Sequence, residues 1–308
     1  MEETVEMSGN HAYRPAPLRA TLAWLCLTAA LAGAGFASIA IWSDYVQTRR
    51  QAEQHLEAAA ALVEEHALGA IGTADQLTAR AAQFVRGKAP GDLWGDWGQW
   101  AELRTMADSL PYVVSLLVVD RDGVVMLGTH AFPAGKTDVS DRVYFQALRE
   151  GDETHVGRTI LGRSAGRYVF TVSRRLDAPD GTFGGAIAVT LDTGYFLEAY
   201  RKSGLGPSAV LTVVRNDGTV IVRHPFSAAA LERSYADDPL FATHLPAGPA
   251  GVFAGASLDA RERLIAYRAS DRLPLVGVAS LDLGEVYRPW LRRTTWTVGL
   301  ALAALVAV

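Results

Sequence analysis

The chain has little cysteine and no excess of positive charge. Cys26 is the single cysteine among 308 residues, which excludes an intramolecular disulfide, so the folded part must be held by its core alone. Lysine and arginine number 29 against 33 aspartate and glutamate, which gives a formal net charge of −4. Because nucleic-acid binding needs a basic surface that neutralises phosphates, we expect no nucleic-acid partner.

Recognisable catalytic and metal-binding motifs are also missing. The 7 histidines are dispersed without metal-binding spacing, and there is no glycine-rich phosphate-binding loop. The stretch GRSAG, residues 162–166, matches the G-x-S-x-G pattern of a nucleophilic serine, but that motif needs a helix after it. A strand-like run follows here, which predicts a hairpin turn instead. We therefore expect no catalytic site, metal or cofactor in these 308 residues.

Charge is absent from the stretch between Leu22 and Trp42. As a helix it is about 31 Å long, at about 1.5 Å per residue, which matches the hydrocarbon core of a bilayer. Trp24 and Trp42 lie near its ends, where interfacial aromatic residues are typical. We predict a tail over residues 1–20 and a transmembrane helix over residues 21–42. The alternative is a cleaved signal peptide.

A second uncharged run closes the sequence, from Thr295 to Val308. It is too short to span a bilayer, but Arg292 and Arg293 precede it as they would flank a membrane helix. We expect residues 295–308 to be the start of a second transmembrane helix, truncated by the end of the chain, and a short buried tail is the alternative. Basic residues are balanced around the first membrane segment, so charge alone does not fix the orientation.

Residues 43–87 predict one long helix. This stretch is rich in Ala, Glu, Gln and Leu, contains no proline, and places apolar residues such as Leu56 and Ala60 at helical spacing. The tryptophan-rich residues 88–100 follow, either as a loop that closes a domain edge with aromatic rings or as a surface that stacks sugars or bases. A short helix is expected over residues 101–110.

One pattern occurs twice, as LLVVDRDGVVMLGT at residues 116–129 and as LTVVRNDGTVIVRH at residues 211–224. An Asp-Gly pair between β-branched runs indicates a tight hairpin turn. Each hairpin begins a unit of roughly 80–100 residues, followed by a helix or loop and by three strands that close at Asp192 or Asp282. The repeat predicts two copies of one α+β unit, each with five antiparallel strands and helices on one side.

The stretch from DVSDRVYFQAL through VGRTILG to LDTGYF, residues 138–196, resembles the membrane-distal module of double Cache sensor domains (PDC, extracellular PAS-like). The resemblance covers roughly residues 43–296. It implies a long extracytoplasmic helix and two tandem PAS-like modules with antiparallel five-stranded sheets. The membrane-distal module would span residues 88–200 and the membrane-proximal module residues 201–291, between two transmembrane helices.

This resemblance also implies a function and a location. Such proteins are two-pass proteins of the bacterial inner membrane, with both termini in the cytoplasm and the sensor in the periplasm. We expect an input domain whose distal module binds a small molecule, most simply a carboxylate-bearing metabolite, while the proximal module relays the signal. One alternative is the first part of a diguanylate cyclase or histidine kinase whose catalytic domain lies beyond residue 308. Another is an interaction ectodomain that binds no small molecule.

A homodimer is expected because the family's outputs work as dimers. Ala29, Gly33 and Ala37 give the small-xxx-small spacing that lets membrane helices approach closely, although a general richness in Ala and Gly would produce the same pattern.

Arg142 and Tyr144 are the first candidates for ligand contact. They lie in the predicted helix SDRVYFQALREG, for which Ser140 or Asp141 is the expected N-cap. A guanidinium offers a rigid fork to a carboxylate, and a phenol adds a hydroxyl and an aromatic wall. In the amino-acid-binding part of the family a similar stretch reads Arg, any residue, Trp, Tyr. Here Tyr and Phe follow instead, which puts free α-amino acids in doubt.

Four further residues are candidates in the same module. Arg163 lies in a turn from which it could reach an anion. Tyr168 and Ser173 lie on one strand but on opposite faces by alternation, and the sequence does not tell which face meets the ligand. Asp192 stands where the amino-acid-binding relatives hold an ammonium group with an acid, and it could instead cap the next segment.

Overall fold

The computed structural model describes residues 18–88, 90–162, 166–256 and 261–307. The chain forms two compact units, which are described separately: residues 51–285 make up one, and residues 1–50 with 286–308 make up the other.

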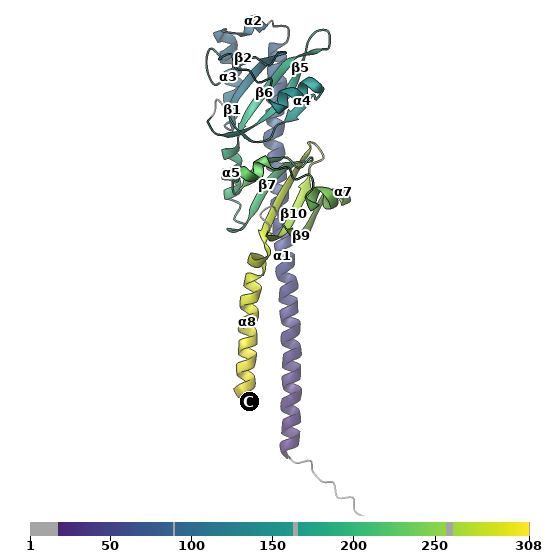
Figure 1. The fold of residues 1–308 in the computed structure, drawn as a ribbon. Coiled ribbons are helices and arrows are strands. Elements are labelled where there is room, and N and C mark those ends of the chain that lie inside the picture. The colour runs from purple at the N-terminus through teal and green to yellow at the C-terminus, as the bar shows by residue number, and fades with distance from the viewer. Residues whose placement is uncertain (1–17, 89, 163–165, 257–260, 308) are drawn as a thin grey trace, which may run out of the picture. The chain divides into compact units, whose positions relative to one another are not determined.

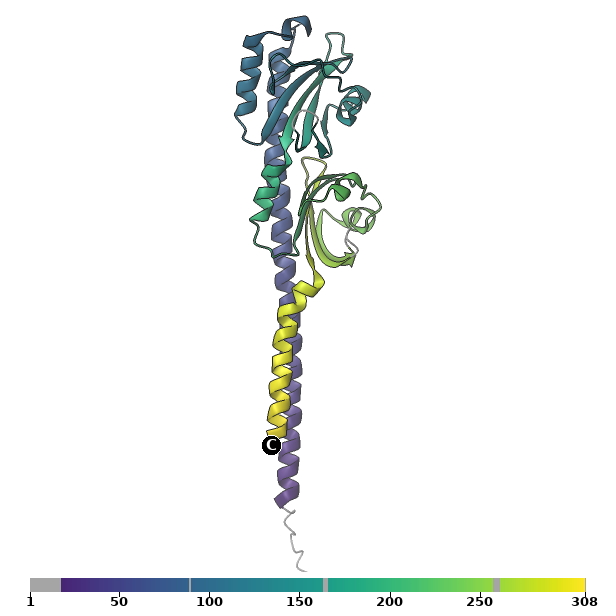
Figure 2. The same cartoon turned by 60° about the vertical axis from the view of Figure 1, so that its left-hand side comes forward.

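The first element is one continuous helix, α1 (Leu18–Val85), of 68 residues. It includes both the uncharged stretch and the predicted long helix without a break at residues 42 and 43. Within the larger unit its buried stripe includes Leu56, Ala60, Val63 and Ala67, which recur at intervals of three and four residues. Figures 1 and 2 show both sheets of that unit beside this part of α1.

The first module of the larger unit contains a six-stranded antiparallel sheet in the order β2-β1-β6-β5-β3, with β4 paired to β5. A short helix and a longer one precede it, and one helix lies between β2 and β3. The elements are α2 (Pro90–Leu93), α3 (Trp97–Asp108), β1 (Val113–Asp120), β2 (Val125–Gly128), α4 (Val143–Glu150), β3 (Thr154–Val156), β4 (Ile160–Leu161), β5 (Tyr168–Asp177) and β6 (Phe183–Asp192).

The second module contains a five-stranded antiparallel sheet in the order β8-β7-β11-β10-β9. The helix α5 (Thr193–Arg201) leads into it from β6. The other elements of the module are β7 (Val210–Arg215), β8 (Val220–His224), α6 (Ala228–Glu232), the π-helical turn η1 (Leu240–His244), α7 (Leu245–Ala247), β9 (Ala250–Ala256), β10 (Glu262–Ala269) and β11 (Leu275–Asp282). After β11 the chain continues into α8 (Leu283–Ala307).

The two sheets share one strand order, which confirms the α+β repeat predicted from the two Asp-Gly hairpins. Gly123 and Gly218 form the two turns with φ of +90° and +80°, values that glycine adopts without steric cost. A Cβ on Gly123 would lie 2.6 Å from the Cβ of Ser140, and one on Gly218 would lie 2.3 Å from the nitrogen of Ala236. Each hairpin is therefore covered by the segment that follows it.

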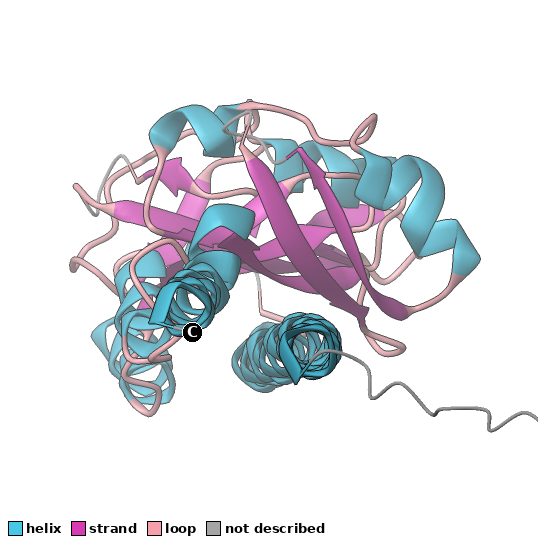
Figure 3. Cartoon of the chain, turned by 90° about the horizontal axis from the view of Figure 1, so that it is seen from below, coloured by secondary structure: helices cyan, strands magenta, loops and turns pink. Residues whose placement is uncertain are grey.

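Each sheet is covered on both faces, so the expected placement of helices on one side is wrong. One face of both sheets packs on α1 in a single apolar cluster that includes Ile187 and Leu264. The other face packs on α4 in the first module, through Phe145, and on α6 and η1 in the second, through Leu231. Figure 3, which looks along α1, shows strands between that helix and the helices on the far side of the sheets.

In the smaller unit, α8 lies against α1 through aromatic rings and one ion pair. Tyr45 stacks on Tyr287 with ring centroids 5.2 Å apart, and Trp290 packs edge-on against Tyr45 at 5.3 Å. The Arg293 guanidinium donates to both carboxylate oxygens of Asp44, each at 2.9 Å. By length and composition α1 is apolar enough to cross a membrane, the one such helix in the part of the chain that the structure describes.

Candidate functional site

Arg142 stands at the start of α4, in the first module. It is the N-cap residue of that helix, in extended conformation, in place of the expected Ser140 or Asp141, and its own side chain makes no capping hydrogen bond. Its side chain is 22% exposed, with Nε 3.8 Å from Oδ1 of Asp141. The guanidinium thus lies at the edge of the module, where its contact with the Asp141 carboxylate is long and weak. It still presents hydrogen-bond donors to solvent.

Tyr144 follows on the buried side of α4. It belongs to an apolar cluster with Phe145, Leu148 and Ala188. Burial raises the pKa of its phenol to about 12, although the nearby positive charge of Arg142 lowers it in part. Arg142 and Tyr144 are therefore close enough to act on one ligand, with the guanidinium outside and the phenol inside.

The two faces of β5 are distinguished by their contacts with α1. Phe170 and Val172 are part of the apolar cluster on α1. Arg174 donates from Nη2 to both carboxylate oxygens of Asp75 on α1, at 2.8 and 2.9 Å. Ser173 therefore lies on the opposite face, where its hydroxyl donates to the carbonyl of His155 at 3.1 Å.

Tyr168 and Asp192 lie together at one end of the first sheet. The hydroxyl of Thr193 donates to the carbonyl of Tyr168. The Tyr168 ring packs against Phe226 of the second module, with centroids 4.5 Å apart. Asp192 caps α5 by accepting from the amide of Gly194 at 2.8 Å, and its other oxygen accepts from Arg167 at 2.6 Å. Asp192 is therefore the N-cap of α5.

The structure brings Tyr144 and Ser173 to one face of the first sheet, but it does not bring all of the candidates to one place. Arg142 and Tyr144 are neighbours, but Asp192 is four strand residues beyond Ala188 of the Tyr144 cluster, which corresponds to about 13 Å. Ser173 pairs with Ala188 on β6 and so lies beside the Tyr144 cluster, whereas the Tyr168 ring packs against Phe226 of the second module. Arg163 lies outside the described residues.

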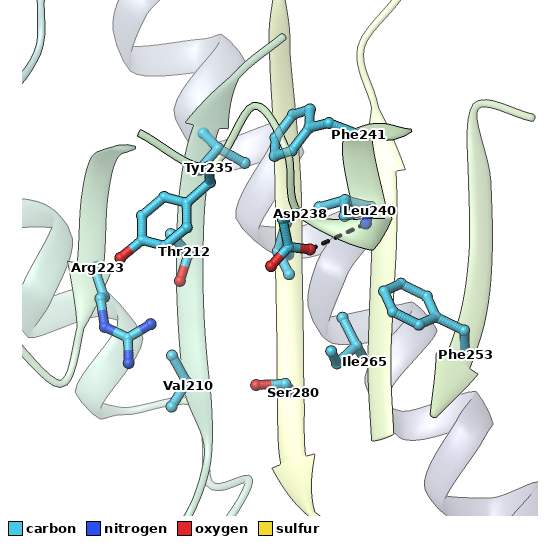
Figure 4. Close-up of a pocket in the computed structure, with 12 residues that line it drawn as sticks. Val210, Thr212, Arg223, Tyr235, Asp238, Leu240, Phe241, Phe253, Ile265 and Ser280 are labelled. Carbon is cyan, nitrogen blue, oxygen red and sulfur yellow. Dashed lines mark hydrogen bonds between the residues drawn. The ribbon is translucent and has the colours of Figure 1, made fainter. Parts of the chain in front are cut away.

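A cavity that the sequence analysis did not anticipate lies in the second module (Figure 4). The sheet forms its floor, with Thr212 on β7 and Ser280 on β11, and the loop after α6 contributes Tyr235 and Asp238. Arg223 on β8 also lines it and is only 9% exposed. The signal was present in the run VIVRH, where the arginine follows three consecutive apolar residues of the strand.

The two modules are joined by hydrogen bonds from side chains. Arg215, at the end of β7, donates from Nη1 to the carbonyl of Val156 at 2.8 Å and to Nε2 of His155 at 3.2 Å. In the reverse direction, the hydroxyl of Thr159 donates to the carbonyl of Ile221. These bonds link β3 and its following loop to the first hairpin of the second module.

Trp100 places the tryptophan-rich stretch at an edge of the first module. Its indole N–H donates to the carbonyls of Gly128 and Ala131, each at 3.2 Å, and its ring stacks on Trp97 at 4.8 Å. This arrangement favours the domain-edge interpretation. Among the residues that the structure describes, no group of three or more His, Cys, Asp or Glu side chains is placed to hold a metal ion.

Comparisons with known proteins agree with this architecture. Residues 193–280 match the dCache_1-like family, described as a histidine kinase sensor domain. The chain is 29% identical to the extracellular domain of a protein assigned as the histidine kinase rpHK1S-Z16, with a TM-score of 0.66 over 77% of this chain and 97% of that one. No curated protein sequence matches the chain.

Two chemoreceptor domains share the fold at lower identity. The periplasmic sensory domain of Campylobacter jejuni Tlp1 is 13% identical, with a TM-score of 0.62 over 79% of this chain and 99% of that one. The ligand-binding domain of Pseudomonas aeruginosa PAO1 PctB, in complex with L-Gln, is 15% identical, with a TM-score of 0.53 over 76% of this chain and 90% of that one.

Proposed function

From the premise that this chain carries a double Cache sensor domain, we propose that it binds a small molecule outside the cytoplasm and transmits that binding across the membrane. The observation that carries this proposal is the repeated strand order beside one long helix, in a fold shared with the extracellular domain of rpHK1S-Z16. An input domain needs an element that reaches from the ligand-binding modules toward the membrane, and α1 is such an element.

The proposed topology has two membrane passes, with the two modules in the periplasm. Support comes from the uncharged part of α1 and from the contacts that hold α8 against it. Tyr45, Tyr287 and Trp290 form an aromatic group of the kind found at bilayer interfaces, close to the predicted end of the first span at Trp42. Residues 295–308 would then run beside the first span, as the start of the second.

The proposed ligand site is the edge of α4, where Arg142 and Tyr144 meet. Arg142 is partly exposed, so a carboxylate could reach its fork, and the buried Tyr144 follows it on the same helix. The PctB domain binds L-Gln, which is also a carboxylate, and this supports the ligand class. Tyr168 and Asp192 lie at the far end of the sheet. They would affect how the two modules are coupled more than they would contact the ligand.

The proposed assembly is a homodimer, and the proposed output is a histidine kinase. In the single chain, a Cβ on Gly33 would meet nothing within 4 Å, so this side of the first span is open to a partner helix. The family match and the rpHK1S-Z16 domain both concern histidine kinases, which favours that output over a diguanylate cyclase.

The test is a ligand screen on the full chain in detergent micelles. Melting temperatures are measured with carboxylates, amino acids and amines, and we expect one carboxylate to stabilise the protein. At about 100 times its dissociation constant the ligand should add about 2.7 kcal/mol, which is roughly 5–10 °C for a unit of this size. R142Q should abolish the shift, because it removes the charged fork.

Arg149, on the same helix, supplies the matched control. Its guanidinium lies over the Phe145 ring at 5.8 Å, away from the start of α4, so R149Q should keep the shift. A stabilising ligand that acts equally on R142Q would contradict the Arg142 site. The absence of any stabilising ligand would favour the interaction ectodomain.

A further inference from the structure

The cavity in the second module has a floor built from adjacent strands. Thr212 on β7 pairs with Arg223 on β8, so their side chains are direct neighbours on one face of the sheet. Val278 on β11 pairs with Thr212, and Ser280 lies two residues further along the same strand. Three polar side chains therefore share the floor, and all three are at least nine-tenths buried.

Arg223 puts a positive charge at one end of the cavity, which favours an anion there. A guanidinium remains protonated in proteins and offers donors in a planar fork that fits a carboxylate in two-point contact. The neighbouring walls are apolar, with Val210 and Ile265 among them, and a low local dielectric strengthens attraction between charges. The hydroxyls of Thr212 and Ser280 can each donate one further hydrogen bond to the same anion.

Asp238 supplies the opposite charge in the roof. Its Oδ1 accepts from the amide of Leu240 at 3.0 Å, which fixes the carboxylate, and Figure 4 shows it pointing over the floor. Burial raises the pKa of the Tyr235 phenol, and the charges of Arg223 and Asp238 act on it in opposite directions. Tyr235 therefore stands within electrostatic reach of both charged side chains.

The size of the cavity limits what it can hold. Its volume is about 50 Å³. A water needs about 10–15 Å³ of such space, so the cavity accepts about four water molecules or a ligand of roughly four to six non-hydrogen atoms. The rings of Phe241 and Phe253 also line that space.

We propose that this cavity is a second ligand site, specific for carboxylates of two to four carbons, with the carboxylate on Arg223 and the carbon chain against the apolar walls. This goes beyond the proposed function, which places the ligand at Arg142 in the first module. The second module continues directly from β11 (Leu275–Asp282) into α8 (Leu283–Ala307), so a ligand here would act on the sheet that leads into that helix.

Isothermal titration calorimetry of the full chain in detergent micelles tests the proposal, with propionate and alanine as the two probes. They share the carboxylate, and only alanine has an ammonium group. We expect saturable binding of at least one of them in the millimolar range or tighter. R223K keeps the charge but loses the fork, and it should weaken that binding by about tenfold or more.

D238N separates the two probes. An asparagine keeps an oxygen to accept from the Leu240 amide, so the roof should remain in place. Without the negative charge, propionate should bind more tightly, because a repulsion is removed. Alanine should bind less tightly, because its ammonium group loses a partner.

S280L is a second variant of the same cavity, which tests the proposal if R223K fails to fold. Leucine fills the cavity and leaves every charge in place, so binding should be lost while the melting temperature holds. R142Q should leave this binding unchanged. The proposal is overturned by the absence of saturable binding of either probe, by binding that survives both R223K and S280L, or by binding that is lost only in R142Q.

Discussion

Replacing Gly277 by alanine is expected to loosen the second module from α1 and to cost about 3 kcal/mol of stability. A Cβ at this position would lie 2.5 Å from the carbonyl oxygen of Ala60 and 2.7 Å from the amide nitrogen of Glu64. Both are backbone atoms of α1, so no side-chain rotation relieves the contact. The strand and the helix must separate, and the apolar cluster between them must be repacked.

Thermal unfolding of the full chain in detergent micelles measures this effect. A loss of about 3 kcal/mol should lower the melting temperature by roughly 6–12 °C in a unit of this size. Gly255 on β9 is the matched control, since the nearest atom to a Cβ there is a ring carbon of Phe253 at an ordinary 3.6 Å. G255A should be close to neutral. Equal behaviour of G277A and G255A would contradict the close packing of β11 on α1.

Replacing Arg215 by methionine is expected to separate the two modules and to cost about 3 kcal/mol. Hydrogen bonds from a charged donor contribute about 1.5–3 kcal/mol each, and Arg215 makes two of them to the first module. Its loss leaves the carbonyl of Val156 in a buried site without that donor. Hydrogen–deuterium exchange should then rise in β3 and in the hairpin after β7, because these are the segments that the side chain joins.

Arg121 in the other hairpin is the control, since its side chain is 75% exposed and lies 3.8 Å from Asp122. R121M should change neither stability nor exchange.

Acid unfolding of R215M is a second measurement of the same side chain. Burial alone would raise the pKa of Asp217, but hydrogen bonds from Arg215 and Thr219 outweigh it and hold the pKa to about 2.

That lowered pKa contributes stability above about pH 4, and the contribution is lost as the pH falls toward about 2. R215M should lose much of this dependence, because the main hydrogen-bond donor to Asp217 is gone. An unchanged acid profile and unchanged exchange in R215M would show that the modules are held together without this side chain.

The sequence predicted the repeat because local chemistry alone determines the hairpins. An Asp-Gly pair between apolar runs requires a turn, and both turns are present with glycine at positive φ. The long helix was equally predictable, since Ala-rich and Leu-rich residues at helical spacing need no tertiary information. The sequence did not predict helices on both faces of the sheets. A strand that is covered on both faces carries apolar residues at successive positions, so it shows no alternation of apolar and polar residues from which the number of covered faces could be read.

The candidate site was less predictable because it depends on which face of a strand meets which partner. Ser173 and Tyr168 differ in face, and the faces are assigned only by contacts with α1, namely the burial of Phe170 against it and the pairing of Arg174 with Asp75. Arg223 was overlooked because an arginine near a strand end is usually solvated, and its burial becomes visible only when η1 and Tyr235 close over the sheet.

The central claim is that the two modules form an extracytoplasmic sensor anchored by α1, and cysteine labelling tests it most directly. C26S removes the single native cysteine, and D122C and S8C then each place one cysteine in a defined part of the chain. Asp122 lies in the first hairpin, with its side chain 77% exposed. A membrane-impermeant maleimide applied to intact spheroplasts should label D122C at once, and S8C only after lysis. Labelling of S8C in intact spheroplasts, or protection of D122C until lysis, would contradict the account.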